Sequence, residues 1–282
     1  MAVRRILVPL DASPDSIAAL EAASDMAARQ RAELLGLFVE DSDLLRYTEY
    51  GFAREVSLCS CSLLPLQKEN LELQLRARSE QVRQRLARVA ESRGIPWSFS
   101  VSRGEVIPQI LEAASKADLT VLGKVGWSLS LGKRTGSTVR AMISHSGRPT
   151  LILQQGSRLL PTALVLYTGS DLSARAISAA SEILRLEQYR LLVYIPAEGQ
   201  PDFERLSRKA GSLLPSGARA EFRHLPRPWH TFLLHELHRE GAKGPLVLPR
   251  EAPDFQGRAL EDFISDVSNP VLVVRQKSQV RE

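Results

Sequence analysis

The stretch LGKVGWSLSLGKRTGST, residues 122–138, is a glycine-punctuated loop between an apolar run and a helical pattern. The preceding DLTVL, residues 118–122, is typical of a buried parallel strand, and the following VRAMIS, residues 139–144, is typical of a helix. A loop that ends at a helix N-terminus presents free backbone N–H groups and about half a positive charge, which suits a phosphate. The sequence therefore predicts an anion-binding loop, with an ordinary surface connection as the alternative.

The spacing of the glycines excludes the best-known phosphate loops. Two residues separate Gly123 from Gly126, and nine separate Gly126 from Gly136. No G-x-G-x-x-G is present, and the nearest candidate for a Walker loop is one residue too long and has Arg134 where Ser or Thr is required. Because glycine admits positive φ and lets a backbone approach an anion closely, a phosphate loop of another type is favoured.

Length and composition bound the class of protein. At about 150 residues per domain, 282 residues predict two domains. No apolar run reaches the ~18 residues of a membrane span, and the first apolar stretch already stops at Asp11. The net charge of +5 is spread over interspersed basic and acidic residues, with no clustered module for nucleic acid. We expect a cytoplasmic protein that binds neither membrane nor nucleic acid.

The chain repeats itself at an offset of 157 residues. RRILVPLDASPDSIAALEAAS, residues 4–24, matches PTALVLYTGSDLSARAISAAS, residues 161–181. The closing segments also correspond, since RPTLIL (148–153) and NPVLVV (269–274) each place a proline before an apolar strand. The sequence therefore predicts two related domains, residues 1–156 and 157–282, called here the first and second halves.

Short apolar runs alternate with longer periodic segments in both halves, a pattern typical of parallel sheets with right-handed crossovers. A ligand in such a sheet is expected beyond the carboxyl ends of the strands. The predicted strands are Arg5–Leu10, Leu34–Val39, Trp97–Val101, Leu119–Leu122, Thr150–Leu153, Ala163–Tyr167, Arg190–Ile195, Arg219–His224, Leu246–Leu248 and Val271–Val274. The predicted helices are Pro14–Arg29, Leu66–Arg93, Val106–Lys116, Ser137–Ser144, Leu172–Leu186, Phe203–Leu213, Trp229–Glu240 and Ala259–Val267, with a short one around Leu44–Tyr50.

The first half resembles the universal stress proteins. The resemblance rests on ILVPLDAS (6–13), SRGEVIPQILEAASKADLTVLG (102–123), the glycine spacing of the loop and GRPTLIL (147–153). It reaches the second half only through the repeat, so the chain looks like a tandem member with two such domains. The resemblance implies an α/β fold in which each domain is a doubly wound, five-stranded parallel sheet of order 3-2-1-4-5, with helices on both faces.

The resemblance also implies a nucleotide site in the first half, with ATP across the strand ends and Mg²⁺ as its counter-ion. Asp11, beside Pro9, would contact the nucleoside, although Asp is equally common as a turn residue. The backbone near Val39 would read adenine. Lys124 would add charge to the phosphates or be a solvated loop residue. The remaining phosphate-loop residues are Gly123, Gly126, Gly136, Ser137 and Thr138, of which the last two are alternatively helix caps.

The second half departs from this pattern. Thr168 takes the place of Asp11, and Pro249-Arg250 takes the place of the first loop glycine and its successor. Proline removes a backbone N–H, and the flexibility of glycine is lost. We therefore expect no nucleotide there and a structural role. In the family, domains pair through their last strands, which implies that Leu151–Leu153 and Val271–Val274 meet edge to edge and hide two exposed edges; further association into a homodimer stays open.

These observations favour an ATP-binding regulatory or stress-response sensor. The sequence assigns no catalytic residue and no metal ligand, so at most slow ATP hydrolysis or autophosphorylation is expected. The alternatives are a scaffold without nucleotide and an ATP-using transferase or adenylating enzyme of similar fold. The closely spaced cysteines Cys59 and Cys61 are interpreted as reduced thiols, and the three histidines His230, His235 and His238 as solvent-facing residues of one helix.

Overall fold

The structure is a computed structural model that describes residues 3–50, 53–57, 62–126, 135–157, 159–160, 162–184, 190–214, 218–239, 244–250 and 258–275. Several residues discussed above lie outside these ranges. They include both cysteines and the centre of the glycine loop from 127 to 134, which contains Arg134.

The first half alternates strands and helices as its pattern predicts. Its strands are β1 (Arg5–Pro9), β2 (Glu33–Asp41), β3 (Arg54–Ser57), β4 (Ser62–Pro65), β5 (Trp97–Gly104), β6 (Leu119–Gly123) and β7 (Thr150–Leu153). Its helices are α1 (Pro14–Gln30), α2 (Ser42–Tyr47), α3 (Lys68–Ser92), α4 (Val106–Ser115) and α5 (Ser137–His145).

The second half repeats this order without the α2–β4 insertion. Its strands are β8 (Thr162–Leu166), β9 (Arg190–Pro196), β10 (Arg219–Leu225), β11 (Leu246–Pro249) and β12 (Val271–Val274). Its helices are α6 (Asp171–Leu184), α7 (Gln200–Gly211), α8 (Trp229–Arg239) and α9 (Arg258–Asp266).

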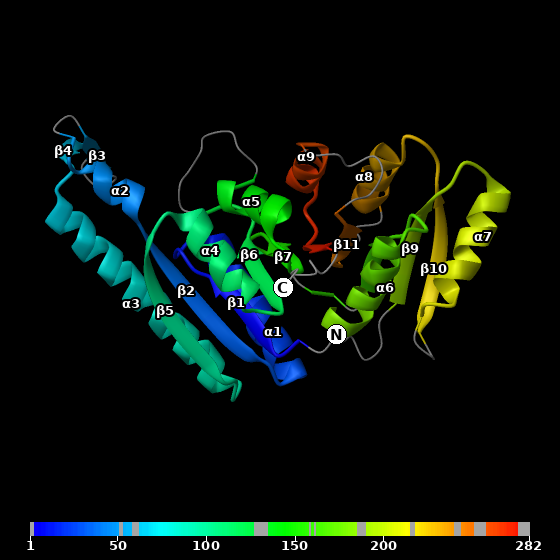
Figure 1. Cartoon of the computed structure of the whole chain (residues 1–282), viewed down its shortest axis with the longest axis horizontal. Coiled ribbons are helices and arrows are strands. Elements are labelled where there is room, and N and C mark those ends of the chain that lie inside the picture. Colours follow the sequence, from blue (N-terminus) through cyan, green and yellow to red (C-terminus); the bar gives the residue numbers. More distant parts are fainter. Residues whose placement is uncertain are drawn as a thin grey trace, which may run out of the picture.

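Within the described residues, ten strands form one sheet in the order β10-β9-β8-β11-β12-β7-β6-β1-β2-β5. Each half contributes five parallel strands in the order 3-2-1-4-5, so the predicted fold class is confirmed. The two sets meet at an antiparallel seam between β7 and β12, in which Leu151 lies opposite Leu272. The halves therefore lie side by side along the long axis of the molecule, with the β3–β4 hairpin at one far end (Figure 1).

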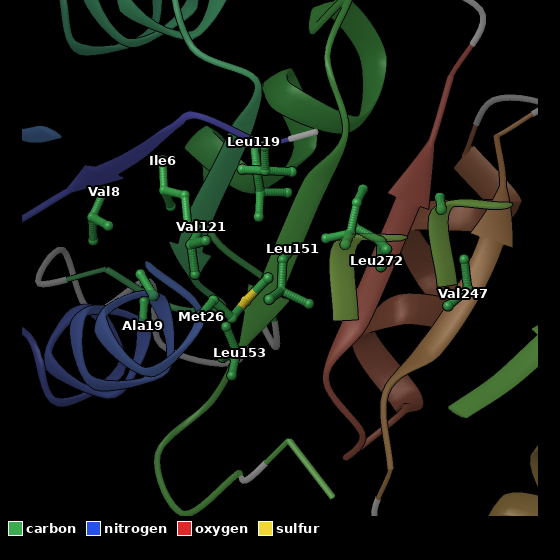
Figure 2. Close-up of a cluster of buried hydrophobic side chains, with 14 of the residues drawn as sticks. Ile6, Val8, Ala19, Met26, Leu119, Val121, Leu151, Leu153, Val247 and Leu272 are labelled. Carbon is green, nitrogen blue, oxygen red and sulfur yellow. The ribbon is translucent and has the colours of Figure 1, made fainter. Parts of the chain in front are cut away.

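Helices cover both faces of this sheet because strand side chains alternate between them. In β1, Ile6 and Val8 face the cluster under α1, α3, α6 and α7, whereas Leu7 faces the cluster under α4, α5, α8 and α9. Both clusters contain residues of both halves. Figure 2 shows the first of them where it crosses the seam, with Leu151 and Leu272 on adjacent strands. The hydrophobic core is thus continuous through the join.

Local signals for helix ends are confirmed by the geometry. The hydroxyl oxygen of Ser13 caps α1 by accepting a hydrogen bond from the backbone N–H of Ser16, with Pro14 in the first turn. Gly94, just beyond α3, has a φ of 61°, the left-handed conformation expected after a helix. The same cap recurs in the second half, where Ser170 accepts from the N–H of Ser173. The repeat therefore extends to individual hydrogen bonds.

The connection between β2 and α3 departs from the prediction. It was expected to hold only a short helix, and that helix is found as α2, but it also forms the antiparallel β3–β4 hairpin. Exposed apolar side chains lie on this insertion and on the first turns of α3, including Tyr47, Leu63 and Leu73. Helix α3 begins at Lys68 and not at Leu66, because Ser62–Pro65 is taken up by β4.

No helix in the described part of the chain is both long and apolar enough to cross a membrane.

Candidate functional site

The candidate site lies at the carboxyl edge of three neighbouring strands. Pro9, the last residue of β1, pairs with Leu37 of β2, and the N–H of Leu10 donates to the Leu37 carbonyl at 2.8 Å. Strand β2 runs on past this level to the half-buried Val39, and β6, on the other side of β1, ends at Gly123. The structure thus brings Pro9, Val39 and Gly123 to one edge of the sheet.

Asp11 begins the tight turn between β1 and α1. Its Oδ1 accepts a hydrogen bond of 2.9 Å from the N–H of Ser13, so the role of a turn residue is present. Its Oδ2 faces the glycine loop, because a Cβ added at Gly126 would lie 2.9 Å from this oxygen. Ala12 has a φ of 66°, an uncommon conformation for a residue with a side chain. The role of a turn residue is therefore confirmed for Asp11 through Oδ1, and Oδ2 lies beside the start of the glycine loop.

Asp15 fixes where the glycine loop leaves the sheet. Its Oδ2 accepts from the N–H of Val125 at 2.9 Å, and its Oδ1 accepts from the N–H of Gln155 at 2.8 Å. One carboxylate in the first turn of α1 thus joins the loop after β6 to the segment after β7. Sequence reasoning missed this residue, since both of its partners lie more than a hundred residues away along the chain and no motif marks them.

The three glycines of the loop have different steric roles. A Cβ at Gly123 would lie 2.6 Å from the backbone carbon of Asp15 and 2.7 Å from the N of Ser16, so only glycine lets β6 pass the start of α1. At Gly136 the nearest atoms to an added Cβ belong to Gly126 and Lys124 at 3.6 Å, which is ordinary contact. The N–H of Gly136 donates to the carbonyl of Lys124 at 3.0 Å. The two ends of the loop are therefore closed against each other.

The loop ends at the N-terminus of α5, a nine-residue helix with Gly136 as its N-cap. Glycine has no side chain to accept a hydrogen bond from the first turn, so the N-cap residue supplies no side-chain cap. Ser137 is exposed and Thr138 is half-buried. The first-turn N–H groups, together with the positive end of the helix dipole, face the closed loop base, and they are the donors that an anion would use.

The side chain of Lys124 contacts the second half of the chain. Its side chain is only 7% exposed, and its ammonium group donates to the carbonyls of Val267 at 2.7 Å and Ser265 at 3.0 Å, at the C-terminus of α9. The alternative of a solvated loop residue is therefore wrong, because the ammonium group is buried against these carbonyls. The adjacent hydroxyl of Thr135 lies 2.5 Å from the Ser265 hydroxyl. Both ends of the loop base thus contact the second half.

Asp118, directly before β6, lies at the opposite edge of the sheet. Its Oδ2 accepts from the backbone N–H groups of Arg4 and Arg5 at 2.9 and 3.1 Å, at the start of β1. This carboxylate is therefore remote from the loop and serves the amino end of the strands.

A separate cleft opens between α1 and α3, on the face of the sheet opposite the one that α5 covers. It has a volume of about 230 Å³ and is lined by Ala12 and Ile17 together with α3 side chains that include Arg85 and Arg88. Arg85 also pairs with Glu21 of α1 at 3.0 Å. The turn that carries Asp11 therefore has the glycine loop on one side and a basic cleft on the other.

The second half retains the backbone frame of the site, and its described side chains differ from those of the first half. The N–H of Tyr167 donates to the carbonyl of Tyr194 at 2.9 Å, as Leu10 does to Leu37, and the N–H of Arg250 donates to Val274, as Lys124 does to Leu153. The side chains differ. Thr168, in the place of Asp11, lies 3.1 Å from the hydroxyl of Ser170 and supplies no carboxylate. The glycine that ends β6 is replaced by the proline that ends β11.

Aromatic side chains fill the strand ends of the second half. Tyr194 takes the place of Leu37 and is fully buried, and Trp229, at the start of α8, is 2% exposed. Both belong to the cluster under α8 and α9. Tyr167 is also fully buried, its hydroxyl has no hydrogen-bond partner among the described residues, and burial raises the pKa of this phenol. The strand ends of the second half therefore carry larger buried side chains than Leu10 and Leu37, the buried residues at the equivalent positions of the first half.

Comparison with known proteins agrees with this architecture. The sequence profile of the universal stress protein family matches residues 2–154. A universal stress protein from Archaeoglobus fulgidus is 18% identical, with 97% of each chain covered and a TM-score of 0.73. A protein from Pseudomonas aeruginosa UCBPP-PA14, described as a universal stress protein, is 15% identical over 98% of this chain and 94% of its own, with a TM-score of 0.62.

No curated protein matches the chain significantly. At these identities the two structural matches show the fold alone, and the paired halves account for their coverage of nearly the whole chain. The family profile, by contrast, spans more than half of the 282 residues and all of the first half's candidate site. The chain therefore belongs to the universal stress protein family.

Proposed function

We propose that the chain is a cytoplasmic regulatory protein that responds to adenine nucleotide, with ATP held by the first half. The observation that carries the proposal is the closed loop base, in which Gly126 and Gly136 meet at the uncapped N-terminus of α5 beside Asp11. Backbone donors at such a terminus suit phosphate oxygens. The Asp11 carboxylate suits ribose hydroxyls or the amino group of adenine, and the backbone beyond Pro9 and at Val39 lies on the same edge.

The second half has a structural role in this proposal. Among the described residues of its equivalent edge, Thr168 replaces the carboxylate of Asp11 and Pro249 replaces the glycine at the loop start, and Tyr194 and Trp229 are buried. Its strand β12 completes the sheet by pairing with β7. One nucleotide per chain is therefore expected.

Calorimetric titration of the full chain with ATP and Mg²⁺, the counter-ion of ATP, tests the proposal. We expect saturation at one ATP per chain for the unaltered protein. Asp11→Ala should weaken binding at least tenfold, because it removes an acceptor of about 1.5–3 kcal/mol. Thr168→Ala, the same position of the repeat in the second half, is the matched control and should leave binding unchanged.

A second variant tests the loop independently. Gly126→Ala places a methyl group 2.9 Å from Oδ2 of Asp11 and should also weaken ATP binding. Binding that persists unchanged in both Asp11→Ala and Gly126→Ala would refute the placement of the site, and absence of any heat with the unaltered chain would favour a scaffold without nucleotide. Counting products after incubation with ATP separates a sensor, with slow turnover at most, from a transferase.

A further inference from the structure

Several polar contacts join the first half's loop and α5 to α9 of the second half and to Val267 directly after it. Lys124 donates to the Ser265 and Val267 carbonyls, and the Thr135 and Ser265 hydroxyls are 2.5 Å apart. At the other end of the two helices, the Ser144 hydroxyl donates to Glu261 at 3.2 Å. Helices α5 and α9 therefore lie antiparallel, with the start of α5 beside the end of α9.

This arrangement has a clear electrostatic basis. The last carbonyls of a helix have no partner within it and carry about half a negative charge. Lys124 supplies the missing donors, and its burial among protein groups makes these charge-assisted bonds stronger than they would be in water. The start of α5 has the opposite partial charge. Lys124 thus lies between the end of α9 and the loop base whose other face is the proposed anion cradle.

The backbone of Lys124 belongs to the loop base itself. Its N–H donates to Leu153 at 2.6 Å and its carbonyl accepts from Gly136, the N-cap of α5. Any movement of the loop base on binding a phosphate therefore moves the residue whose side chain caps α9. Thr135, directly before that N-cap, repeats the link from the other end of the loop.

We propose that Lys124 and Thr135 are positioning residues that couple nucleotide occupancy in the first half to the packing of the last turn of α9 in the second. The coupling rests on the proposed ATP site, and it assigns the second half the role of a built-in responder. Lys124 acts through backbone and helix end and not by touching phosphate.

Hydrogen exchange of the full chain, with and without ATP, tests this coupling. In the unaltered protein, ATP should slow exchange of the amides at 264–268 by a factor of five or more, the usual lower range of allosteric coupling. Lys124→Met keeps an apolar stem in the buried position and removes the donors, so it should abolish this response when compared at ATP concentrations that saturate each protein. Ser265→Ala removes the hydroxyl contact with Thr135, together with the hydrogen bond that this hydroxyl donates to the Glu261 carbonyl, and should reduce the response. Lys116→Met, at an exposed lysine paired with Glu112, is the control.

The outcomes separate the coupling from the nucleotide site. If ATP binds and exchange at 264–268 does not change, or if Lys124→Met responds like the unaltered chain, the coupling is wrong. If the unaltered chain binds no ATP, the proposed function is wrong. The mechanical link between the loop base and α9 is then tested by hydrogen exchange of the unaltered chain and Lys124→Met in the absence of ATP. Lys124→Met should then speed exchange both at Gly136 and at 264–268, and an effect confined to one side would overturn it.

Discussion

Ala12 and Gly169 occupy the same place in the two halves, 157 residues apart, and both have positive φ, 66° and 80°. Each lies in the turn between the first strand and the first helix of its half. The backbone of this turn has therefore kept one shape, although only the second half has the residue that adopts it without strain. This difference gives the first prediction.

Ala12→Gly should stabilise the protein. A left-handed residue with a Cβ costs about 1–2 kcal/mol, part of which is offset by the greater chain entropy of glycine in the unfolded state. We expect the free energy of unfolding to rise by about 0.5–1 kcal/mol, measured by urea denaturation. The reverse change, Gly169→Ala, should lower it, because the added Cβ would also lie 2.6 Å from a methyl carbon of Leu206. Equal destabilisation by both variants would contradict the strain at Ala12.

Gly123 and Gly136 should respond differently to alanine. Gly123→Ala forces a Cβ into the backbone of Asp15 and Ser16, which cannot give way without moving α1, so it should cost about 1–3 kcal/mol of stability. Gly136→Ala meets only ordinary contacts and has a φ of −70°, so its stability should stay within about 0.5 kcal/mol of the unaltered chain. Thermal or urea unfolding of both variants decides the matter, and equal losses would exclude the steric explanation.

Asp15→Asn should loosen the start of the glycine loop. The carboxylate accepts two backbone N–H groups, whereas an amide offers one oxygen and would turn its NH₂ toward the other donor. We expect a loss of about 1–3 kcal/mol in stability and faster exchange of the Val125 and Gln155 amides, measured by NMR. Asp25→Asn, on an exposed part of the same helix, is the control. If the two amides stay as protected as before, Asp15 does not hold the loop.

Tyr167→Phe should stabilise the second half, because the buried hydroxyl has no described partner and its desolvation is not repaid. We expect a gain of about 1 kcal/mol at neutral pH. Burial raises the pKa of this phenol, so the folded state disfavours the phenolate that the unfolded chain forms near pH 10. The tyrosine chain should therefore lose stability as pH rises through that value more than the phenylalanine variant does. Identical alkaline profiles would argue against a buried, neutral Tyr167.

Trp229→Ala should lower the stability of the second half without creating a second ATP site. Removing this indole from a position only 2% exposed should cost about 3–5 kcal/mol. Calorimetry should detect no second ATP on the variant, because the backbone at Pro249 and the absent carboxylate at Thr168 are unchanged. A second binding event would mean that the aromatic filling alone suppresses the site.

Much of the fold could be predicted because its signals are local. The strands are short apolar runs, Ser13 with Pro14 announces α1, and Gly94 announces the end of α3, each within a few residues of the feature it determines. The β3–β4 hairpin escaped prediction because its strands lack a regular alternation. In the site, the glycines and Asp11 could be placed by their position after strands. The contacts of Asp15 and the orientation of Lys124 could not, since they depend on partners 110 and more than 140 residues away.

The antiparallel join between β7 and β12 has a consequence for how the molecule can diverge. Two copies of a single-domain chain paired through the same strands would dissociate on dilution, and their two domains would be identical in sequence. A covalent link keeps the partner at a high effective concentration whatever the amount of protein. Each half can then accumulate substitutions that the other does not share. This permits the observed asymmetry, in which the first half has a carboxylate at Asp11 and the second half has buried aromatic side chains around Trp229.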